Sequence, residues 1–278
     1  VEGQRRLGER STLGQFDLPR ALDGGLTAEL MATSFDPAIS GGGVRQTIRY
    51  IDAYYQEIAA FSDMATPAVS GDDILKAKGQ GKVAHVLSME GAEGLEGNLE
   101  VLRIFYRLGL RFLGLTWNRR NEAADGVGEL RTSGGLSEFG VALVRECNRL
   151  GVVIDIAHLS PAGVKDVLEL SEMPVVATHA NCDALWPHRR NLTDAQLEAI
   201  AAKGGVVGVA AVPSFLGESE KRASLNAMLD HVDHMLRVMG EDHVGLGMDF
   251  DGVGDARVEG MEDVSKLPNL TQGLVERG

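Results

Sequence analysis

Residues 152–160 read VVIDIAHLS and residues 175–181 read VVATHAN. Each stretch is a short apolar run that ends in a histidine, His158 in the first and His179 in the second. Runs that are apolar throughout, instead of alternating with polar residues, are typical of parallel strands buried on both faces. Residues 162–170, which lie between the two runs, have a helical pattern. The three segments together predict a strand–helix–strand unit with parallel strands.

The same alternation of strand and helix extends along most of the chain. Apolar, β-prone runs predict seven strands, at residues 26–35, 83–88, 112–116, 152–157, 175–178, 206–211 and 244–248. Helical patterns lie between them, at residues 44–61, 99–108, 137–150, 162–170, 194–203 and 222–239. This order indicates an α/β fold built on a parallel sheet.

Polar residues follow five of the predicted strands within one to three positions: Glu90, Asn118, His158, His179 and Asp249. In a (β/α)₈ barrel the carboxyl ends of all strands face one common site, whereas an open, doubly wound sheet gathers residues from five strands less easily. We therefore predict a TIM-type (β/α)₈ barrel in which one strand is missing from the count. No linker-like segment divides the chain, so residues 1–278 are predicted to form a single domain.

Composition excludes some functions and sets a default location. The 278 residues carry 27 basic and 40 acidic side chains, a net charge of −13, which argues against a nucleic-acid partner. No run of 18 apolar residues is present, so no membrane-spanning segment is expected. Cys147 and Cys182 form no CxxC motif, and a reducing, cytoplasmic compartment is the expectation.

Histidines at the ends of two successive strands suggest a metal site. Neighbouring strands lie about 5 Å apart, so the imidazoles of His158 and His179 can share one ion. Neutral imidazole suits zinc, and the carboxylate of Glu90 in VLSMEGAEG can complete the ligand set. Either histidine alone could simply be hydrogen-bonded, and Glu90 alone could be a solvated loop charge. The matched pair favours a metal site of the hydrolytic type.

Further charged residues have a functional and an ordinary interpretation. Asp249 in GLGMDFDG could bind metal or transfer a proton, whereas Asp251 before Gly252 is more typical of a turn. Arg190 offers a fork for a substrate carboxylate, or it belongs to a surface arginine pair with Arg189. His231 and His234 are helical neighbours for which a solvated helix face is predicted, and His85 lies inside its strand.

Longer strings, in order along nearly the whole chain, resemble the membrane (renal) dipeptidase family of the amidohydrolase-like barrels. The matching strings are FDLPRALDGGLTAELMA, SMEGAEGL, LGLTWNRRNEAADG, LSEFGVALVRECNRLGVVIDIAHLS, VVATHANCDALWPHRRNLTD, DHVDHMLRVMGEDHVGLGMDFDGV and MEDVSKLPNL. Any one string is a weak signal, but so many in sequence order are specific.

The resemblance implies a zinc dipeptidase with two metal ions per subunit, often a homodimer. It implies that Glu90 bridges both ions and that His158 and His179 complete the ligands of one of them. Arg190 resembles the residue that grips the C-terminal carboxylate of the substrate, and Asp249 resembles the acid/base beside the bridging water.

Trp117 and Asn118, in the string LTWN, fall in the part of the site that binds substrate. Members of the family carry a substrate-polarising histidine where this chain has Trp117. The difference affects how the oxyanion is stabilised and which substrates are accepted.

The chain also departs from the family at its two ends. The family's first strand ends in a His-x-Asp pair that binds the second metal, and no such pair precedes FDLPR here. We expect truncation just after that pair and again after EDVSKLPNL, with true loss of the second metal site as the alternative. Two other functions stay open: an amidohydrolase acting on N-acyl amino acids or lactams, and an inactive homologue that only binds small molecules.

Overall fold

The parallel sheet is the frame on which the rest of the chain is arranged. The computed structural model describes residues 5–36, 38, 42–129, 131–132, 134–217, 219 and 221–278. Its main sheet contains β1 (Ala28–Ser34), β3 (Val83–Glu90), β4 (Phe112–Gly114), β5 (Val153–Asp155), β6 (Val176–Ala180), β7 (Val206–Val209) and β9 (Val244–Leu246), hydrogen-bonded in that order. All six pairings are parallel. These are the seven predicted strands, and the sequential parallel order confirms the predicted barrel-type fold.

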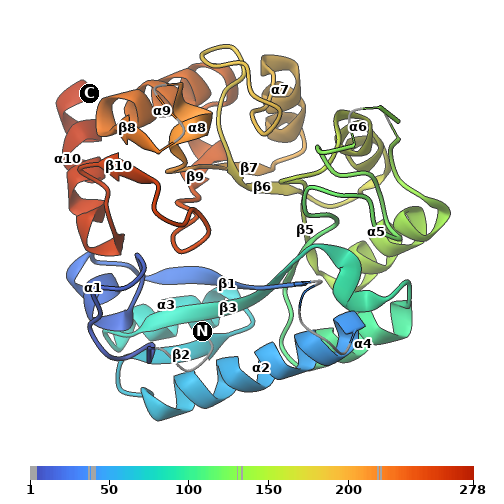
Figure 1. The fold of residues 1–278 in the computed structure, drawn as a ribbon, viewed down its shortest axis with the longest axis horizontal. Coiled ribbons are helices and arrows are strands. Elements are labelled where there is room, and N and C mark those ends of the chain that lie inside the picture. The colour runs from blue at the N-terminus through green and yellow to red at the C-terminus, as the bar shows by residue number, and fades with distance from the viewer. Residues whose placement is uncertain are drawn as a thin grey trace.

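Helices surround the curled sheet, as Figure 1 shows. Those that connect the strands are α2 (Gly42–Ala60), α3 (Gly71–Gly79), α4 (Leu99–Arg107), α5 (Glu138–Leu150), α6 (Pro161–Leu170), α7 (Asp194–Ala202) and α9 (Leu225–Met239). The shorter helices α1 (Leu18–Asp23), η1 (Ala92–Leu95), α8 (Pro213–Leu216), η2 (Glu241–His243) and η3 (Val264–Lys266) lie in the connections, and α10 (Leu267–Arg277) comes last. Within the described residues β1 and β9 are the two ends of the strand order and do not pair with each other.

Local chemistry explains where the helices next to the site begin and end. Ser160 caps α6 by accepting a hydrogen bond from the Gly163 backbone N–H, and Pro161 occupies its first turn. Thr193 and Gln196 form a reciprocal capping box at the start of α7. Gly151, with φ of 76°, ends α5 in the left-handed conformation that glycine tolerates.

One large hydrophobic cluster fixes the strands against the helices. It includes residues from Leu18 to Leu270 and takes buried members from every strand of the seven except β1 and β9, whose apolar residues are partly buried or exposed. Leu113 and Ile154 are almost fully buried, as the continuous apolar runs predicted. The cluster holds the strand ends, and therefore the residues that follow them, at fixed positions.

The structure corrects several predicted bounds. Most strands are shorter than their apolar runs, but β3 extends to Glu90 and β6 extends through His179 to Ala180. Residues Arg222–Ser224 are not helical: they form β8, which pairs in parallel with β10 (Arg257–Glu259), and α9 begins only at Leu225.

The sequence patterns missed the shorter elements and the last helix, α10, and β2 and α3 show why. The short strand β2 (Ala65–Ala68) pairs with the first half of β3, and α3 follows it. Four residues are too few to show a period, and α3 buries only Ala77, so neither element has a clear pattern. No helix among the described residues has both the length and the apolar character needed to span a bilayer.

Candidate metal centre

Three strand ends bring Glu90, His158 and His179 together. Glu90 ends β3, His158 follows β5 by three residues, and His179 is the last residue but one of β6. The His158 Nε2 atom is 3.0 Å from His179 Nε2 and 3.1 Å from Glu90 Oε1, and His179 Nε2 is 3.5 Å from Glu90 Oε1. In a tetrahedral zinc site with bonds of about 2.0–2.1 Å, neighbouring ligand atoms lie roughly 3.3 Å apart. The three atoms therefore have the spacing that a single bound ion requires, and they could hold one.

Burial keeps both imidazoles in the form that binds metal. It lowers the pKa of His158 to about 2 and that of His179 to about 3, with the charge of Arg190 acting in the same direction. Both rings are therefore neutral at pH 7, and neutral imidazole is the ligand form. His158 Nδ1 lies 3.0 Å from the Asn118 Oδ1 atom, an acceptor, so Nδ1 carries the proton and Nε2 is left with a free lone pair.

His158 is held in an unusual backbone conformation. Four non-glycine residues have positive φ among the described residues, and His158 (66°) and Asp249 (59°) are two of them. The His158 carbonyl accepts hydrogen bonds from the Val127 N–H at 2.8 Å and from the Thr116 hydroxyl at 3.3 Å. Left-handed backbone at non-glycine residues costs free energy and is concentrated at functional sites, where the surroundings impose it. Here the loop after β4 imposes it.

A buried cation lies beside the cluster. The Arg190 side chain is almost fully buried, its Nη2 donates to the His179 carbonyl at 3.3 Å, and its Nε has no hydrogen-bond partner among the described residues. Burial lowers its pKa to about 10, opposed by the charges of Asp155, Asp249 and Glu90, so the group stays charged at neutral pH. Of the two sequence interpretations, the buried position argues against a surface pair, although Arg189 itself is exposed.

Asp249 follows β9 by three residues and faces the same charges. Burial, followed by repulsion from Glu90, raises its pKa to about 7, and Arg190 acts against the rise. A carboxyl group with a pKa near neutrality can both accept and return a proton. Asp251 instead lies in the following turn, where its carboxylate binds the Arg5 guanidinium and the Gln15 N–H.

Comparison with known proteins identifies the family. The model of the membrane dipeptidase family, peptidase family M19, matches residues 4–278. This chain belongs to that family. A dipeptidase of Claviceps purpurea is 33% identical over 275 residues, which cover 95% of this chain and 64% of the relative. A dipeptidase of Aspergillus oryzae is 35% identical over 276 residues, or 95% of this chain and 65% of the relative. The chain thus spans slightly less than two thirds of the length of these two relatives.

Solved structures of similar proteins agree with the fold. A metallo peptidase from Rhodobacter sphaeroides, liganded with a phosphinate mimic of the dipeptide L-Ala-D-Ala, is 32% identical and has a TM-score of 0.89, covering 96% of this chain and 85% of that one. An amidohydrolase from Pseudomonas aeruginosa is 29% identical with a TM-score of 0.85, covering 94% and 85%. The cluster of Glu90, His158 and His179 thus lies at the strand ends of a family M19 barrel.

The remaining predicted residues lie on the loop after β4. The Trp117 side chain is 50% exposed, and its ring centroid is 6.0 Å from that of His158. Asn118 contacts His158 directly, as described above. All seven predicted site residues are therefore linked. Glu90, His158 and His179 form the cluster, and Trp117 and Asn118 contact His158. Arg190 contacts His179, and Asp249 interacts through charge with Glu90 and Arg190.

Other histidines do not join the cluster. The predicted solvated face for His231 is wrong: the side chain is 1% exposed, and Nδ1 accepts the Cys182 N–H at 3.0 Å. Packing of α9 against the loop after β6 buries that face. His234 pairs with Asp194, and His85 pairs with Glu29 on the neighbouring strand.

Sequence reasoning missed two residues that are linked to His179 by hydrogen bonds. Asp155 in β5 and Thr178 in β6 are hydrogen-bonded to each other, and Thr178 contacts the His179 ring. The available signal was the charge of Asp155 inside the apolar run VVIDIA, because a buried carboxylate requires partners.

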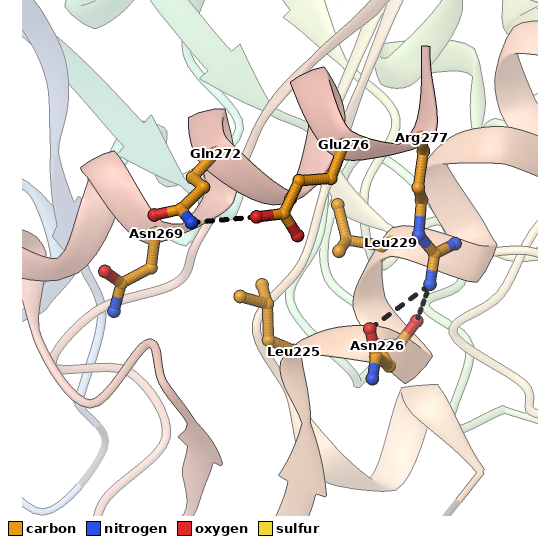
Figure 2. A pocket seen from close by; sticks show the side chains of 8 residues that line it. Leu225, Asn226, Leu229, Asn269, Gln272, Glu276 and Arg277 are labelled. Atoms are coloured by element: carbon orange, nitrogen blue, oxygen red, sulfur yellow. Dashed lines mark hydrogen bonds between the residues drawn. The ribbon is translucent and has the colours of Figure 1, made fainter.

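Two grooves lie elsewhere on the described surface. One, of about 420 Å³, lies between α9 and α10 and is lined by Leu225, Asn226, Leu229, Asn269, Gln272, Gly273, Glu276 and Arg277 (Figure 2). There Arg277 binds Asn226, Asp230 and Asp233, so its charge is already neutralised. The other, of about 610 Å³, borders the loop that carries Arg189. Neither groove includes a residue of the metal cluster.

Proposed function

We propose that this chain is a zinc-dependent dipeptidase. The observation that carries the proposal is the convergence of Glu90, His158 and His179 on one ion-sized point, beside the buried charge of Arg190. The relatives named as dipeptidases, and the similar metallo peptidase liganded with a dipeptide mimic, support it.

The ligand set suits zinc. Two neutral imidazoles and one carboxylate, with a position left for water or substrate, are the donors of many hydrolytic zinc sites. A zinc ion held there would act as a Lewis acid and lower the pKa of a water molecule. The chain's part is to keep both imidazoles neutral, which burial achieves, and to hold them by Asn118 and the Thr178 hydroxyl.

Asp249 is proposed to move the proton. In its ionised form the carboxylate takes a proton from the attacking water and then returns it to the amine that leaves. Its raised pKa of about 7 matches both steps at neutral pH. The neighbouring charges of Glu90 and Arg190 act on the pKa in opposite directions and keep it in this range.

Arg190 is proposed to select the substrate. Its guanidinium is charged and buried, and its Nε has no partner in the described chain, so a substrate carboxylate would provide the missing acceptor. A free carboxylate bound beside the metal limits the substrate to very short peptides. Trp117 and Asn118 would form the adjoining wall, with the exposed indole available to an apolar side chain.

The number of zinc ions per chain depends on residues beyond this cluster. Among the residues that the structure describes, Glu90, His158 and His179 are the only group of three metal-binding side chains within reach of one another. Bound zinc per chain, measured by inductively coupled plasma mass spectrometry, separates the alternatives. Two ions support the binuclear site, one supports a mononuclear hydrolase, and none supports a protein that only binds small molecules.

A substrate panel tests the activity. The zinc-loaded protein should release amino acids from L-Ala-D-Ala and L-Ala-L-Ala, and a His179→Ala variant should not. N-acetyl amino acids form the second arm, because they keep the carboxylate that Arg190 would bind and because Trp117 leaves the acyl side open. Turnover of N-acyl amino acids without dipeptides would replace the proposal with the amidohydrolase alternative.

The domain assignment is also a proposal. We propose that residues 1–278 form one domain, because a single sheet takes strands from Ala28 to Leu246 and one hydrophobic cluster takes residues from Leu18 to Leu270.

A further inference from the structure

Asp155 is a buried carboxylate whose hydrogen bonds are all directed to the strand ends at the metal cluster. Its Oδ1 accepts the backbone N–H groups of Ala157 and Thr178, both at 2.9 Å. Its Oδ2 accepts the Thr178 hydroxyl at 2.6 Å. The residue is 7% exposed, so these donors replace water almost completely.

The hydroxyl of Thr178 connects this carboxylate to a ligand imidazole. Thr178 Oγ1 lies 2.8 Å from His179 Nδ1. A hydroxyl has one proton and two acceptor lone pairs. Since the proton of Thr178 is donated to Asp155, its oxygen can only accept from the ring. His179 Nδ1 must then carry the imidazole proton, and Nε2 has a free lone pair.

We propose that Asp155 and Thr178 are positioning residues that fix His179 in the Nδ1-protonated tautomer, with Nε2 free for a metal ion. The metal-binding consequence rests on the proposed function, whereas the tautomer is a property of the chain itself. His158 is oriented in the same sense by Asn118. Two free Nε2 lone pairs and a carboxylate oxygen then face one another within 3.0–3.5 Å. These electron-rich atoms repel one another unless a cation lies between them.

The reverse arrangement is chemically possible and is poorly supported by the geometry. A protonated Asp155 would donate to Thr178, whose hydroxyl would donate to Nδ1 and place the ring proton on Nε2. The carboxylate, however, already accepts two backbone N–H groups and lies near the charge of Arg190. Burial raises the pKa of Asp155, and the two backbone N–H groups and the Thr178 hydroxyl act against that rise, in favour of the ionised carboxylate.

Thr178 is also held firmly in place. A Cβ atom added to Gly247 would lie 1.8 Å from the Thr178 carbonyl oxygen, and one added to Gly208 would lie 2.2 Å from it. Only glycine permits β7 and the segment after β9 to approach β6 this closely. The close approach fixes the Thr178 backbone, and the 2.6 Å hydrogen bond to Asp155 orients its hydroxyl.

Zinc affinity of two variants tests the positioning role. Residues that orient a metal-binding histidine typically contribute about 10–100-fold in affinity. Thr178→Val removes the hydroxyl at nearly constant volume, and we expect chelator competition to show a loss of that size. Thr178→Ser keeps the hydroxyl and should restore affinity to near the wild-type value. Thr33→Val is the matched control, because Thr33 is a buried strand threonine whose hydroxyl contacts the Ser88 carbonyl and no residue of the metal cluster.

A second readout needs no metal and separates this inference from the proposed function. Two-bond ¹H–¹⁵N spectra of the chelator-treated protein report the tautomer of each histidine. We expect the Nδ1-protonated form for His179 in the wild type and in Thr178→Ser, with a shift towards Nε2-protonation in Thr178→Val. An Nε2-protonated wild type, or unchanged zinc affinity in Thr178→Val, would overturn the inference. A wild type that binds no zinc but shows the Nδ1 tautomer would overturn the proposed function alone.

Discussion

At the scale of single residues, position relative to a strand end decided what the sequence could predict. Glu90, His158 and His179 were predictable because a barrel directs such residues to one site, and the structure places them together. Asp155 and Thr178 were not, because their roles depend on a contact between two strands. The burial of His231 was likewise set by packing of α9, which its helical spacing does not reveal.

Replacing Asp249 by asparagine should slow turnover strongly while stabilising the metal-free protein at high pH. Loss of a proton-transfer group typically costs about 10²–10⁴-fold in rate. The folded-state pKa, about 7, is raised from the ordinary 3.8, so the folded protein favours the protonated form. The wild type therefore loses stability as pH rises through that window, whereas the Asp249→Asn variant has no charge to bury at this position.

The measurement is the melting temperature of both proteins from pH 4 to pH 8 in the presence of a chelator. The melting temperature of the variant should rise relative to that of the wild type from pH 4 to about pH 7 and then level off, because above that pH Asp249 is ionised in both the folded and the unfolded state. A difference that does not change with pH would show that Asp249 is ionised without penalty.

Replacing Arg190 by alanine should affect substrates according to their charge. Hydrogen bonds to charged groups contribute about 1.5–3 kcal/mol, so KM for a dipeptide should rise roughly 10- to 150-fold. KM for the corresponding dipeptide amide, which lacks the carboxylate, should change little. Arg189→Ala is the control, since Arg189 is exposed and next in sequence. An equal rise for both substrates would contradict the proposed role of Arg190.

At the scale of elements, the loop after β4 is hydrogen-bonded to the backbone of His158 and restrains it. Asp125 in this loop is buried and accepts hydrogen bonds from Arg120, Thr132 and the Gly134 N–H. Its own carbonyl accepts the Ser160 N–H, and Val127 donates to the His158 carbonyl. The sequence patterns predicted no strand or helix between residues 116 and 137, because the order of this loop comes from contacts with the segment after β5.

Asp125→Asn should weaken the hydrogen bonds that order this loop and should destabilise the protein at neutral pH. The Arg120 guanidinium, aided by Thr132, lowers the pKa of Asp125 to about 2. The stabilisation is therefore complete above the ordinary pKa near 4 and is lost as pH falls towards 2. Denaturant unfolding should show a deficit for the variant at pH 7 that shrinks between pH 4 and pH 2. The exposed Asp255→Asn should show no deficit at either pH, and a deficit in Asp125→Asn that persists at pH 2 would exclude the ionised carboxylate as its cause.

At the scale of the whole molecule, the predicted alternation of seven strands and their helices is confirmed, and the sheet has two free edges, β1 and β9, in the described chain. The segment before α1 lies against the C-terminal part of the chain, where Val264 donates to the Gln15 carbonyl and Arg5 pairs with Asp251. Short elements such as β2 could not be predicted, because four residues show no period. A homodimer and a cytoplasmic location remain predictions.

Zinc should stabilise the whole fold, because its ligands lie at the ends of three different strands. An ion that binds only the folded chain adds about 2.7 kcal/mol at a concentration 100 times its Kd. The melting temperature should therefore rise by several degrees with zinc. It should not rise in a His158→Ala variant, and the same shift in both proteins would place the ion elsewhere.

Glu90, His158 and His179 are proposed to hold the ion on which peptide hydrolysis depends. The most direct measurement is the rate of L-Ala-D-Ala hydrolysis before chelation, after chelation and after zinc is restored, in the wild type and in His179→Ala. We expect activity that chelation abolishes and zinc restores in the wild type, and none under any condition in the variant. Hydrolysis that survives both chelation and the substitution would contradict the claim.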